Sequence, residues 1–345
     1  MAEKLLLDYG SGGCASHRLV AELFLKHFEN PILAAMNDAA LLEIDGPLAV
    51  STDTFTVDPI FFPGGDIGSL AVHGTVNDVA MLGARPLYLT CGFVLEEGLD
   101  MDMLRTIVAS MAKSAANAGV SIIAGDTKVV PRGAVDKIFI NTTGIGRILV
   151  EPCPSGHRAA PGDAVLLSGT LGDHGLSILA KRHGLAFDTT LASDAASLNG
   201  LVERLIAVVG QEGAIHVLRD PTRGGLATTL NEIAGQSGTC IEIEEGSVPV
   251  HPSVAAGCSL LGLDPFYLAN EGKMVCIILQ ELAEEALAVL RSDPLAVCAR
   301  RIGTVRAPGN LKGTPTWAGQ VVMTTRLGGH RLLGMLEGEQ LPRIC

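Results

Sequence analysis

The segment Gly68-Ser69-Leu70-Ala71-Val72-His73-Gly74-Thr75-Val76-Asn77-Asp78-Val79-Ala80 places a carboxamide and a carboxylate inside an apolar stretch with helical spacing. This spacing predicts a helix over residues 66–82, with Asp66 as its N-cap. A turn role is not available to Asp78 in the middle of a helix, and an unpaired carboxylate buried there would be costly. Asp78 therefore either has a buried structural partner or holds a ligand.

Strand patterns lie on both sides of this helix, which favours an α/β protein. A composition of 48% hydrophobic residues with 41 glycines suits strands and helices joined by tight turns. In the first half we predict strands at 41–44, 48–51, 87–94, 120–124 and 138–144, and further helices at 16–28 and 100–118.

A break in the pattern at Glu151-Pro152-Cys153-Pro154-Ser155-Gly156 marks the expected domain boundary. We predict an N-terminal domain over 1–154, a C-terminal α/β domain over 155–337 and a mobile tail over 338–345, because Gly338 and Pro342 discourage further helix. The expected elements of the second domain are strands at 164–168, 241–243, 274–279, 299–305 and 316–322, and helices at 172–183, 196–210, 224–236, 281–291 and 329–336.

Charge and hydropathy narrow the class of partner. The net charge is −12 and no basic stripe offsets it, which argues against a nucleic-acid partner. No apolar run approaches the length that spans a bilayer, and the opening Met1-Ala2-Glu3-Lys4 lacks the features of a secretory signal. We therefore expect a cytoplasmic protein without a membrane partner.

Aspartates lie at the ends of several predicted strands. Asp38 precedes one, Asp53 ends one and Asp126 follows one. Taken singly, each is better explained as a cap or turn residue, because aspartate favours both places. Together with Asp78 they suggest a magnesium site, since Mg²⁺ prefers carboxylate oxygens and takes its remaining ligands from water and substrate phosphates.

Two glycine-rich segments are candidate phosphate contacts, although the chain has neither a P-loop nor a dinucleotide-binding fingerprint. Arg223-Gly224-Gly225 opens a predicted helix, where free backbone N–H groups and a guanidinium suit an anion. A capped helix with a surface arginine explains this segment equally well. Ser11-Gly12-Gly13 can close over phosphates, but glycine-rich N-termini are more often simply loose.

The last residue is Cys345, one of eight cysteines that form no Cys-x-x-Cys pair. A thiol on a mobile chain end can be loaded by another protein and then fold back into its own site. Only the thiolate attacks, and we expect Arg343, two residues away, to lower the thiol pKa below its ordinary value of about 8.5.

Taken together, the motifs resemble one family. They follow one another in the order Asn37-Asp38-Ala39-Ala40, Ser51-Thr52-Asp53, the opening segment 68–80, Ala124-Gly125-Asp126-Thr127-Lys128, Arg219-Asp220-Pro221-Thr222-Arg223-Gly224-Gly225 and Asn270-Glu271-Gly272. The set resembles the ATP-binding superfamily of aminoimidazole ribonucleotide synthetase, selenophosphate synthetase and thiamine-monophosphate kinase, over essentially the whole chain. The C-terminal Pro342-Arg343-Ile344-Cys345 narrows the resemblance to the HypE family of hydrogenase maturation proteins.

This resemblance implies a PurM-like α/β (α+β) fold of two domains, a homodimer whose N-terminal halves pair into a β-barrel, and ATP with Mg²⁺ at the domain interface. It implies catalytic roles for Cys345, Lys128 and Glu271, with Glu271 as the base and Lys128 holding the carbamoyl oxygen, and no assignable role for His73. Metal ligands by position are Asp38, Asp53, Asp78, Asp126 and Asp220. Nucleotide contacts by position are Ser11, Gly12, Gly13, Asp38, Asn77, Asp78, Thr127, Arg223, Gly224 and Gly225.

The implied reaction is the ATP-dependent dehydration of an S-carbamoyl group on Cys345 to a thiocyanate, which supplies cyanide to the iron centre of NiFe hydrogenases. The implied partners are the carbamoyltransferase HypF as donor and the HypC–HypD complex as acceptor. The alternatives are a small-molecule synthetase or kinase of the same superfamily, such as selenophosphate synthetase, and a non-catalytic ATP-sensing adaptor. Cys14 lacks the nearby lysine that follows the reactive residue of selenophosphate synthetases, and is expected to be an ordinary cysteine.

Overall fold

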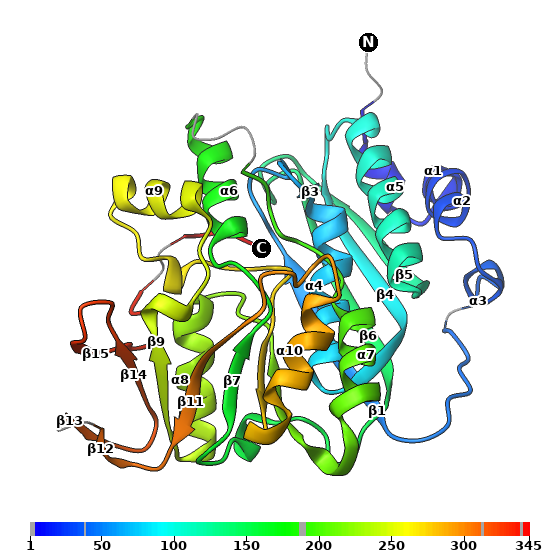
Figure 1. Ribbon diagram of the computed structural model, residues 1–345. Helices are drawn as coiled ribbons and strands as arrows, with labels where there is room; N and C mark the ends of the chain where they lie inside the picture. The colour runs from blue at the N-terminus through cyan, green and yellow to red at the C-terminus, as the bar shows by residue number, and fades with distance from the viewer. Residues whose placement is uncertain (1–3, 38, 186–190, 312–313, 339–340) are drawn as a thin grey trace.

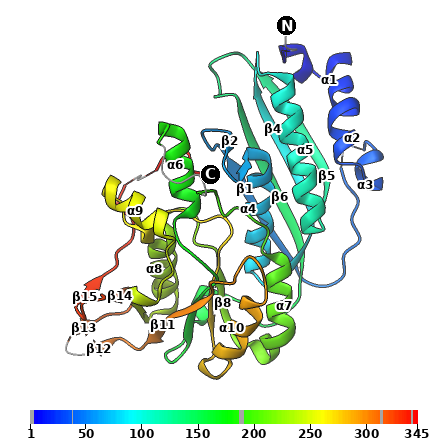
Figure 2. The same cartoon turned by 45° about the horizontal axis from the view of Figure 1, so that its top comes forward.

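The computed structural model describes residues 4–37, 39–185, 191–311, 314–338 and 341–345. Its two largest sheets, four-stranded and seven-stranded, come from the first and second halves of the chain (Figures 1 and 2). The two-domain α/β expectation is thus confirmed.

The four-stranded sheet has the order β1-β6-β4-β5, with only the β4–β5 pair parallel. Helices α4 and α5 cover one of its faces, where Leu70 and Leu104 pack with Phe55, Leu89 and Ile140 of the strands. The elements of this half are β1(Leu48–Phe55), β2(Phe61–Phe62), β3(Gly65–Asp66), β4(Ala84–Glu96), β5(Ser121–Val130), β6(Ile138–Ile148), α1(Cys14–Leu19), the π-helical turn Val20–Phe24, α2(Leu25–His27), α3(Pro31–Ala34), α4(Ile67–Met81) and α5(Met101–Ala118).

Helix α4 forms where the sequence predicted it. The side chain of Asp66 accepts hydrogen bonds from the backbone N–H groups of Gly68 and Ser69, and the Ser69 hydroxyl oxygen accepts one from the Asp66 N–H, so the first turn is capped in both directions. Nearly all of its residues are buried, because the helix lies between the first sheet on one side and α7 of the second half on the other. It carries Asn77 and Asp78 into the boundary between the halves.

The seven-stranded sheet has the order β15-β14-β9-β11-β7-β10-β8. Alternate residues of β7 point to opposite faces: Val165 and Leu167 pack with α8, and Ala164 and Leu166 pack with α7 and α10. The elements of this half are β7(Ala164–Leu167), β8(Ile215–Arg219), β9(Cys240–Glu244), β10(Val275–Ile278), β11(Arg300–Arg306), β12(Gly309–Leu311), β13(Thr314–Thr316), β14(Gln320–Thr324), β15(His330–Leu332), α6(Asp173–His183), α7(Asn199–Val209), α8(Gly225–Ser237), α9(Pro252–Leu261) and α10(Ala283–Arg291).

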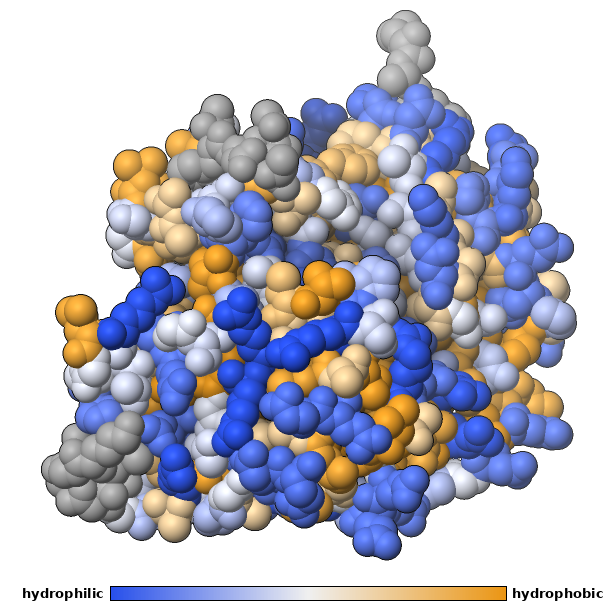
Figure 3. Space-filling model, in the orientation of Figure 1, coloured by the Kyte–Doolittle hydropathy of each residue, from blue (hydrophilic) through white to orange (hydrophobic). Residues whose placement is uncertain are grey.

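The outer sides of α7 and α10 carry hydrophilic and hydrophobic residues side by side on the face drawn in Figure 3. Among the described residues, no helix has both the length and the hydropathy of a membrane-spanning segment.

Two predicted elements are wrong. Residues 41–44 form no strand, because no neighbouring strand pairs with them, and Leu41 is 84% exposed. Residues 329–336 form no helix: a turn at Thr325–Gly329 sends the chain back, and β15 pairs antiparallel with β14. The predicted strand 316–322 lies a few residues early, since a turn precedes β14, and β8 and α9 were not predicted.

Candidate active site

The chain end is bound between the two halves. In Figure 1 it comes to lie between α6 and the first sheet. The carbonyl oxygen of Cys345 accepts hydrogen bonds from the backbone N–H and the hydroxyl of Thr56, at 3.0 and 3.3 Å. The carbonyl oxygen of Arg343 accepts from the Asp58 N–H at 3.2 Å and from the Arg182 guanidinium at 2.8 Å. The last residues of the tail are therefore docked in this structure.

Between these two residues, Ile344 anchors the tail through both its carbonyl and its side chain. The side chain is only 6% exposed and belongs to the core of the first half. The Ile344 carbonyl oxygen lies 2.8 Å from Nε2 of His174. Because a carbonyl can only accept, Nε2 carries the proton, and Nδ1 then accepts from the Ser193 hydroxyl at 2.8 Å. Burial lowers the pKa of His174, which keeps the ring neutral in this arrangement.

The Arg343 side chain points away from the thiol. Its guanidinium donates to Asp136 and to the Thr56 carbonyl, both at 2.7 Å, and lies over the ring of Phe139. Burial raises the pKa of the Cys345 thiol to about 12, with Glu271 and Asp53 adding to the rise and Arg223 opposing it. The expectation that Arg343 would activate the thiol is wrong for the docked tail, because Arg343 is engaged elsewhere.

Cys345 borders a cavity of about 400 Å³ that is also lined by Thr54, Arg223 and Gly224. Gly224 and Gly225 begin α8 with φ of +77° and +62°. A Cβ at Gly225 would lie 2.6 Å from the carbonyl oxygen of Leu268, so the backbone approach there requires glycine. The predicted helix start thus faces the docked thiol.

Four carboxylates lie close enough to perturb the pKa values of one another, and two of them, Glu271 and Asp53, also act on the Cys345 thiol; the other two are Asp78 and Asp220. Burial raises the pKa of Asp220 to about 7, and the charges of Asp78 and Asp53 contribute to the rise. Burial likewise raises the pKa of Asp53 and of Asp78, although Ser51 donates a hydrogen bond to Asp78 at 2.7 Å. Such a cluster of mutually repelling carboxylates favours a bound cation.

The donor set fits magnesium bound together with a phosphate ligand. In the ranges that the structure covers, no three histidine, cysteine or acidic side chains converge on one point that would hold an ion by themselves. Mg²⁺ commonly takes only one or two carboxylates and completes its shell with water and phosphate oxygens. Asp38, a fifth predicted ligand, lies outside the described residues.

Glu271 is the most strongly perturbed of these groups. It is 2% exposed, and within the described part of the chain its Oε1 has no hydrogen-bond partner. Burial, with the charges of Asp220 and Asp194, raises its pKa well above the ordinary value. A buried carboxyl with a raised pKa beside the reacting group is suited to accept a proton near neutral pH.

The other predicted residues lie at a second cavity of about 350 Å³, lined by Gly12, Asp126, Thr127 and Lys128 among others. It shares no lining residue with the cavity at Cys345. Ser11 and Gly13 flank Gly12 at its edge, and Lys128 pairs with Asp126 at 3.1 Å on the surface. Strands β1 and β5 are the two edges of the first sheet, so Asp53 and Asp126 are about 14 Å apart at the usual strand spacing. A single chain does not bring Lys128 to the docked thiol.

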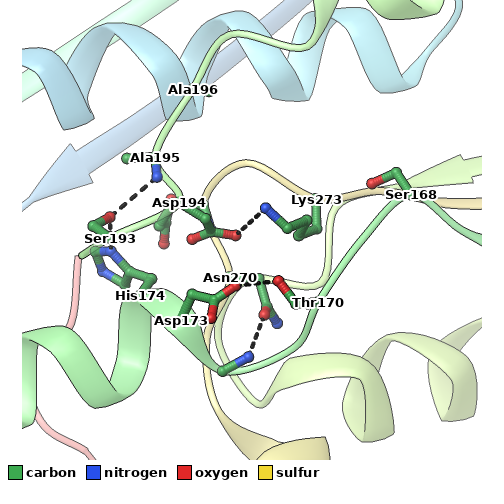
Figure 4. A network of polar contacts seen from close by, with 12 residues as sticks. Ser168, Thr170, Asp173, His174, Ser193, Asp194, Ala195, Ala196, Asn270 and Lys273 are labelled. Atoms are coloured by element: carbon green, nitrogen blue, oxygen red, sulfur yellow. Dashed lines mark hydrogen bonds and ion pairs between the residues drawn. The ribbon is translucent and has the colours of Figure 1, made fainter. Parts of the chain in front are cut away.

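A segment without regular secondary structure, residues 191–198, connects the parts of the site (Figure 4). It was not recognised in the sequence, where the helix predicted at 196–210 began three residues too early. Ser193 bonds to His174, and Asp194 accepts from the backbone N–H of Glu271 at 3.1 Å. Lys273 supplies the counter-charge of Asp194 at 3.3 Å. No periodic pattern marks this segment, so only its run of small and polar residues could have signalled it.

The same segment accounts for two residues of α4. The amide of Asn77 donates to the carbonyl oxygens of Ala196 and Glu271 and accepts from the Leu198 N–H at 2.7 Å. Its groups therefore hold the two halves together in this structure, and the nucleotide contact stays a prediction. His73 lies 2.7 Å from the Ser197 hydroxyl, and burial lowers its pKa to about 4, so it is a neutral structural residue.

Comparisons with known proteins agree with this geometry. Models of the AIR synthase related protein match the chain at residues 36–148 for the N-terminal domain and 160–314 for the C-terminal domain. A Cupriavidus necator protein named carbamoyl dehydratase HypE is 51% identical over 341 residues, which cover 98% of this chain and 94% of that protein. The chain belongs to the HypE family.

Two solved HypE structures extend the comparison. A structure of hydrogenase maturation protein HypE in complex with ATP is 67% identical, covers 99% of this chain and 100% of its own, and has a TM-score of 0.95. A chain of a HypE–HypF complex is 47% identical, covers 92% of this chain and 99% of its own, and has a TM-score of 0.79. The PurM-like fold inferred from the sequence motifs is therefore that of the HypE family.

Proposed function

We propose that this protein is an ATP-dependent carbamoyl dehydratase that converts an S-carbamoyl group on Cys345 to a thiocyanate. The observation that carries the proposal is the docked chain end, which places the Cys345 thiol at a cavity beside Arg223 and within the electrostatic reach of Glu271 and Asp53. The ATP named in the related HypE structure supplies the energy for the removal of oxygen.

The reaction has two steps, a phosphoryl transfer to the carbamoyl oxygen and an elimination of phosphate. The carbamoyl oxygen attacks the γ-phosphorus of ATP, and the bond between that phosphorus and the β–γ bridging oxygen breaks to release ADP. The C–O bond then breaks with phosphate as the leaving group, the nitrogen loses its two protons, one to Glu271 and one to the departing phosphate, and Cys–S–C(=O)–NH2 becomes Cys–S–C≡N. Phosphoryl transfer of this kind depends mainly on positioning and electrostatics.

The residues of the chain divide these tasks. Glu271 takes a nitrogen proton, because its buried carboxyl has a raised pKa and an Oε1 without a hydrogen-bond partner among the described residues. Arg223 and the N–H groups at the start of α8 offset charge on the transferring phosphoryl group. Asp53, Asp78 and Asp220 would hold Mg²⁺, which supplies charge neutralisation at the phosphates.

The active protein is proposed to be a homodimer in which Lys128 acts on cargo carried by the other copy. This arrangement is supported by the separation of Lys128 from Cys345 within one chain, across the width of the first sheet. Mixing Lys128→Ala with Cys345→Ala protein tests it. If the lysine comes from the second copy, each mixed dimer has one intact site and activity is restored. If Lys128 and Cys345 act within one chain, no site is intact and the mixture stays inactive.

The proposed partners are HypF as the carbamoyl donor and the HypC–HypD complex as the cyanide acceptor, in the cytoplasm. The solved HypE–HypF complex supports the first of these. A pull-down of the full chain with each partner measures both contacts. The Cys345→Ser variant, which cannot carry the carbamoyl group but keeps the protein surface, serves as the control.

Intact-mass measurement tests the central proposal. Carbamoylated protein should lose the mass of one water when magnesium and ATP are added, and Cys345→Ser protein should carry neither group. Persistence of the carbamoyl mass while ATP is bound would contradict the mechanism. Activity that survived removal of residues 342–345 would instead favour a selenophosphate synthetase-like enzyme, and ATP hydrolysis without loss of water would favour an ATP-sensing adaptor.

A further inference from the structure

The folded body binds the main chain of the tail at every one of its last three residues. The carbonyl oxygens of Arg343, Ile344 and Cys345 accept hydrogen bonds at 2.8–3.3 Å from groups of the two halves. Main-chain recognition of this kind is how proteins bind extended peptides. The donors belong to the loop after β1 and to helix α6.

Side-chain contacts add selectivity at two positions. Ile344 fills an apolar site in the core of the first half. Arg343 is held by Asp136, by the Thr56 carbonyl and by the ring of Phe139. An apolar anchor next to a paired cation fits an Arg-Ile pair at the two positions before the terminal cysteine.

The chain that leads to the tail contributes little to docking. Leu333 is the last buried residue before it, and Gly334 is the last to accept a hydrogen bond, from Tyr267. Residues 335–338 form no hydrogen bond with any other residue that the structure describes. The recognised unit is therefore short, and its covalent connection to the body is not part of the recognition.

From these contacts we propose that the groove formed by Thr56, Asp58, Asp136, His174 and Arg182 is a peptide-binding site, and that the protein dehydrates S-carbamoyl cysteine at the end of a separate Arg-Ile-Cys peptide. The proposal rests on the proposed function. The chemistry is unchanged: the carbamoyl oxygen leaves as phosphate, ATP becomes ADP, the nitrogen loses two protons, and the peptide sulfur keeps its bond to carbon. The substrate class is an S-carbamoylated peptide thiol.

The protein's own tail competes for this groove, because a short tether gives an effective concentration on the order of millimolar. The double variant Ile344→Asp, Cys345→Ser of the full chain therefore frees the groove. The aspartate disfavours docking of the tail at the apolar site, and the serine removes the thiol of the tail. Calorimetry with magnesium and ATP shows whether this variant retains its nucleotide site.

The experiment supplies this variant with the peptide Leu-Pro-Arg-Ile-Cys, S-carbamoylated with cyanate, together with magnesium and ATP. Mass spectrometry should show loss of water from the peptide at a rate that saturates with peptide concentration. Replacing isoleucine by aspartate in the peptide should lower kcat/KM at least about tenfold, from the loss of its apolar burial. Anisotropy of the labelled, unloaded peptide measures binding without turnover.

Matched variants of His174 separate recognition from folding. His174→Gln keeps an N–H donor for the Ile344 carbonyl, whereas His174→Phe keeps a ring of similar shape without a donor. We expect His174→Phe to weaken peptide binding by about five- to tenfold and His174→Gln to restore most of it, since one hydrogen bond is at stake. A purely structural role would affect nucleotide binding equally and would show no rescue.

The outcomes are distinct. Turnover of the chain's own carbamoyl group without any binding or turnover of the peptide would overturn this inference and leave the proposed function standing. Failure of both reactions would overturn the proposed function itself. Peptide turnover at the same rate with isoleucine or aspartate would overturn the peptide-binding inference alone, because the groove would then not be the recognition site.

Discussion

Docking of the tail can be weakened at one side chain. Ile344→Ala removes three carbon atoms from a side chain that is 6% exposed. At about 0.8 kcal/mol per buried carbon, the docked state loses about 2.4 kcal/mol. Because 1.4 kcal/mol corresponds to a factor of ten, the undocked fraction should rise by roughly 50-fold.

Alkylation of Cys345 by iodoacetamide measures that fraction. In the docked state burial raises the thiol pKa to about 12, so at pH 8 only about one thiol in 10,000 is ionised. A free tail, with a thiol pKa of about 8.5, is ionised to about one quarter at the same pH. Reaction therefore proceeds through the undocked tail, and peptide mapping separates Cys345 from the exposed Cys298, which serves as the internal reference.

We expect the alkylation rate of Cys345 to rise by tens of fold in Ile344→Ala while that of Cys298 stays constant. Leu327→Ala is the matched control, since Leu327 is 99% exposed and makes no core contact. An equal Cys345 rate in wild-type and Ile344→Ala protein would refute the docking reasoning, because it would mean that the anchor contributes nothing to the position of the thiol.

Three further predictions concern the body of the protein. Glu271→Gln should lower dehydration at least about 100-fold while calorimetry finds ATP binding retained, because only proton acceptance is lost; wild-type turnover would rule out its role as the base. Asp220→Asn should raise the thermal midpoint of the metal-free protein and weaken magnesium-dependent ATP binding. The wild-type chain loses stability as the pH rises from the unfolded pKa near 4 towards the folded pKa of about 7, so the gain of the variant should grow over that window and then level off; a gain that shrank with pH would contradict the sign. Gly225→Ala should destabilise the protein by at least about 2 kcal/mol, because its φ is +62° and its Cβ would meet the Leu268 carbonyl, whereas Gly235→Ala, in open space within the same helix, should be neutral or stabilising by up to about 1 kcal/mol; equal thermal midpoints for the two variants would disprove the steric argument.

The sequence predicted most elements of the fold because local signals and burial agree in them. Helix α4 has both its apolar spacing and its capping box in its own residues, and the Asp100 cap and the Gly119 stop of α5 are equally local. The strand predicted at 41–44 failed because strand formation depends on a partner that the residues themselves do not specify. The helix predicted at 329–336 failed because Gly328 and Gly329, at its expected start, belong to a hairpin turn.

The candidate site was predictable where charged residues lie within short sequence motifs. The charges of Asp53, Arg223 and Glu271 act on the docked cysteine, and Asp78 and Asp220 act in turn on Glu271. The grouping of these residues apart from Lys128 depends on which strands are sheet edges, which is a property of topology.

The tail contacts could not be read from the sequence at all. His174 and Arg182 lie on α6, while Asp136 lies between β5 and β6, and each acts on a main-chain or tail group that only the folded structure brings near. The pKa of the Cys345 thiol is raised where the sequence predicted a lower value, for the same reason. Docking buries the thiol, and the guanidinium of Arg343 points away from it towards Asp136.

Segment 191–198 has a consequence for how this protein can vary. Ser193 orients the imidazole of His174, which binds the chain end, and Asp194 accepts a hydrogen bond from the backbone of Glu271. The backbone groups of Ala196 and Leu198 hold the side-chain amide of Asn77. A shift of one residue along this stretch would displace all three at once. Inserting or deleting a residue here should therefore abolish turnover even if the helices and sheets on either side stay intact, so that eight irregular residues tolerate less change in length than the regular elements they connect.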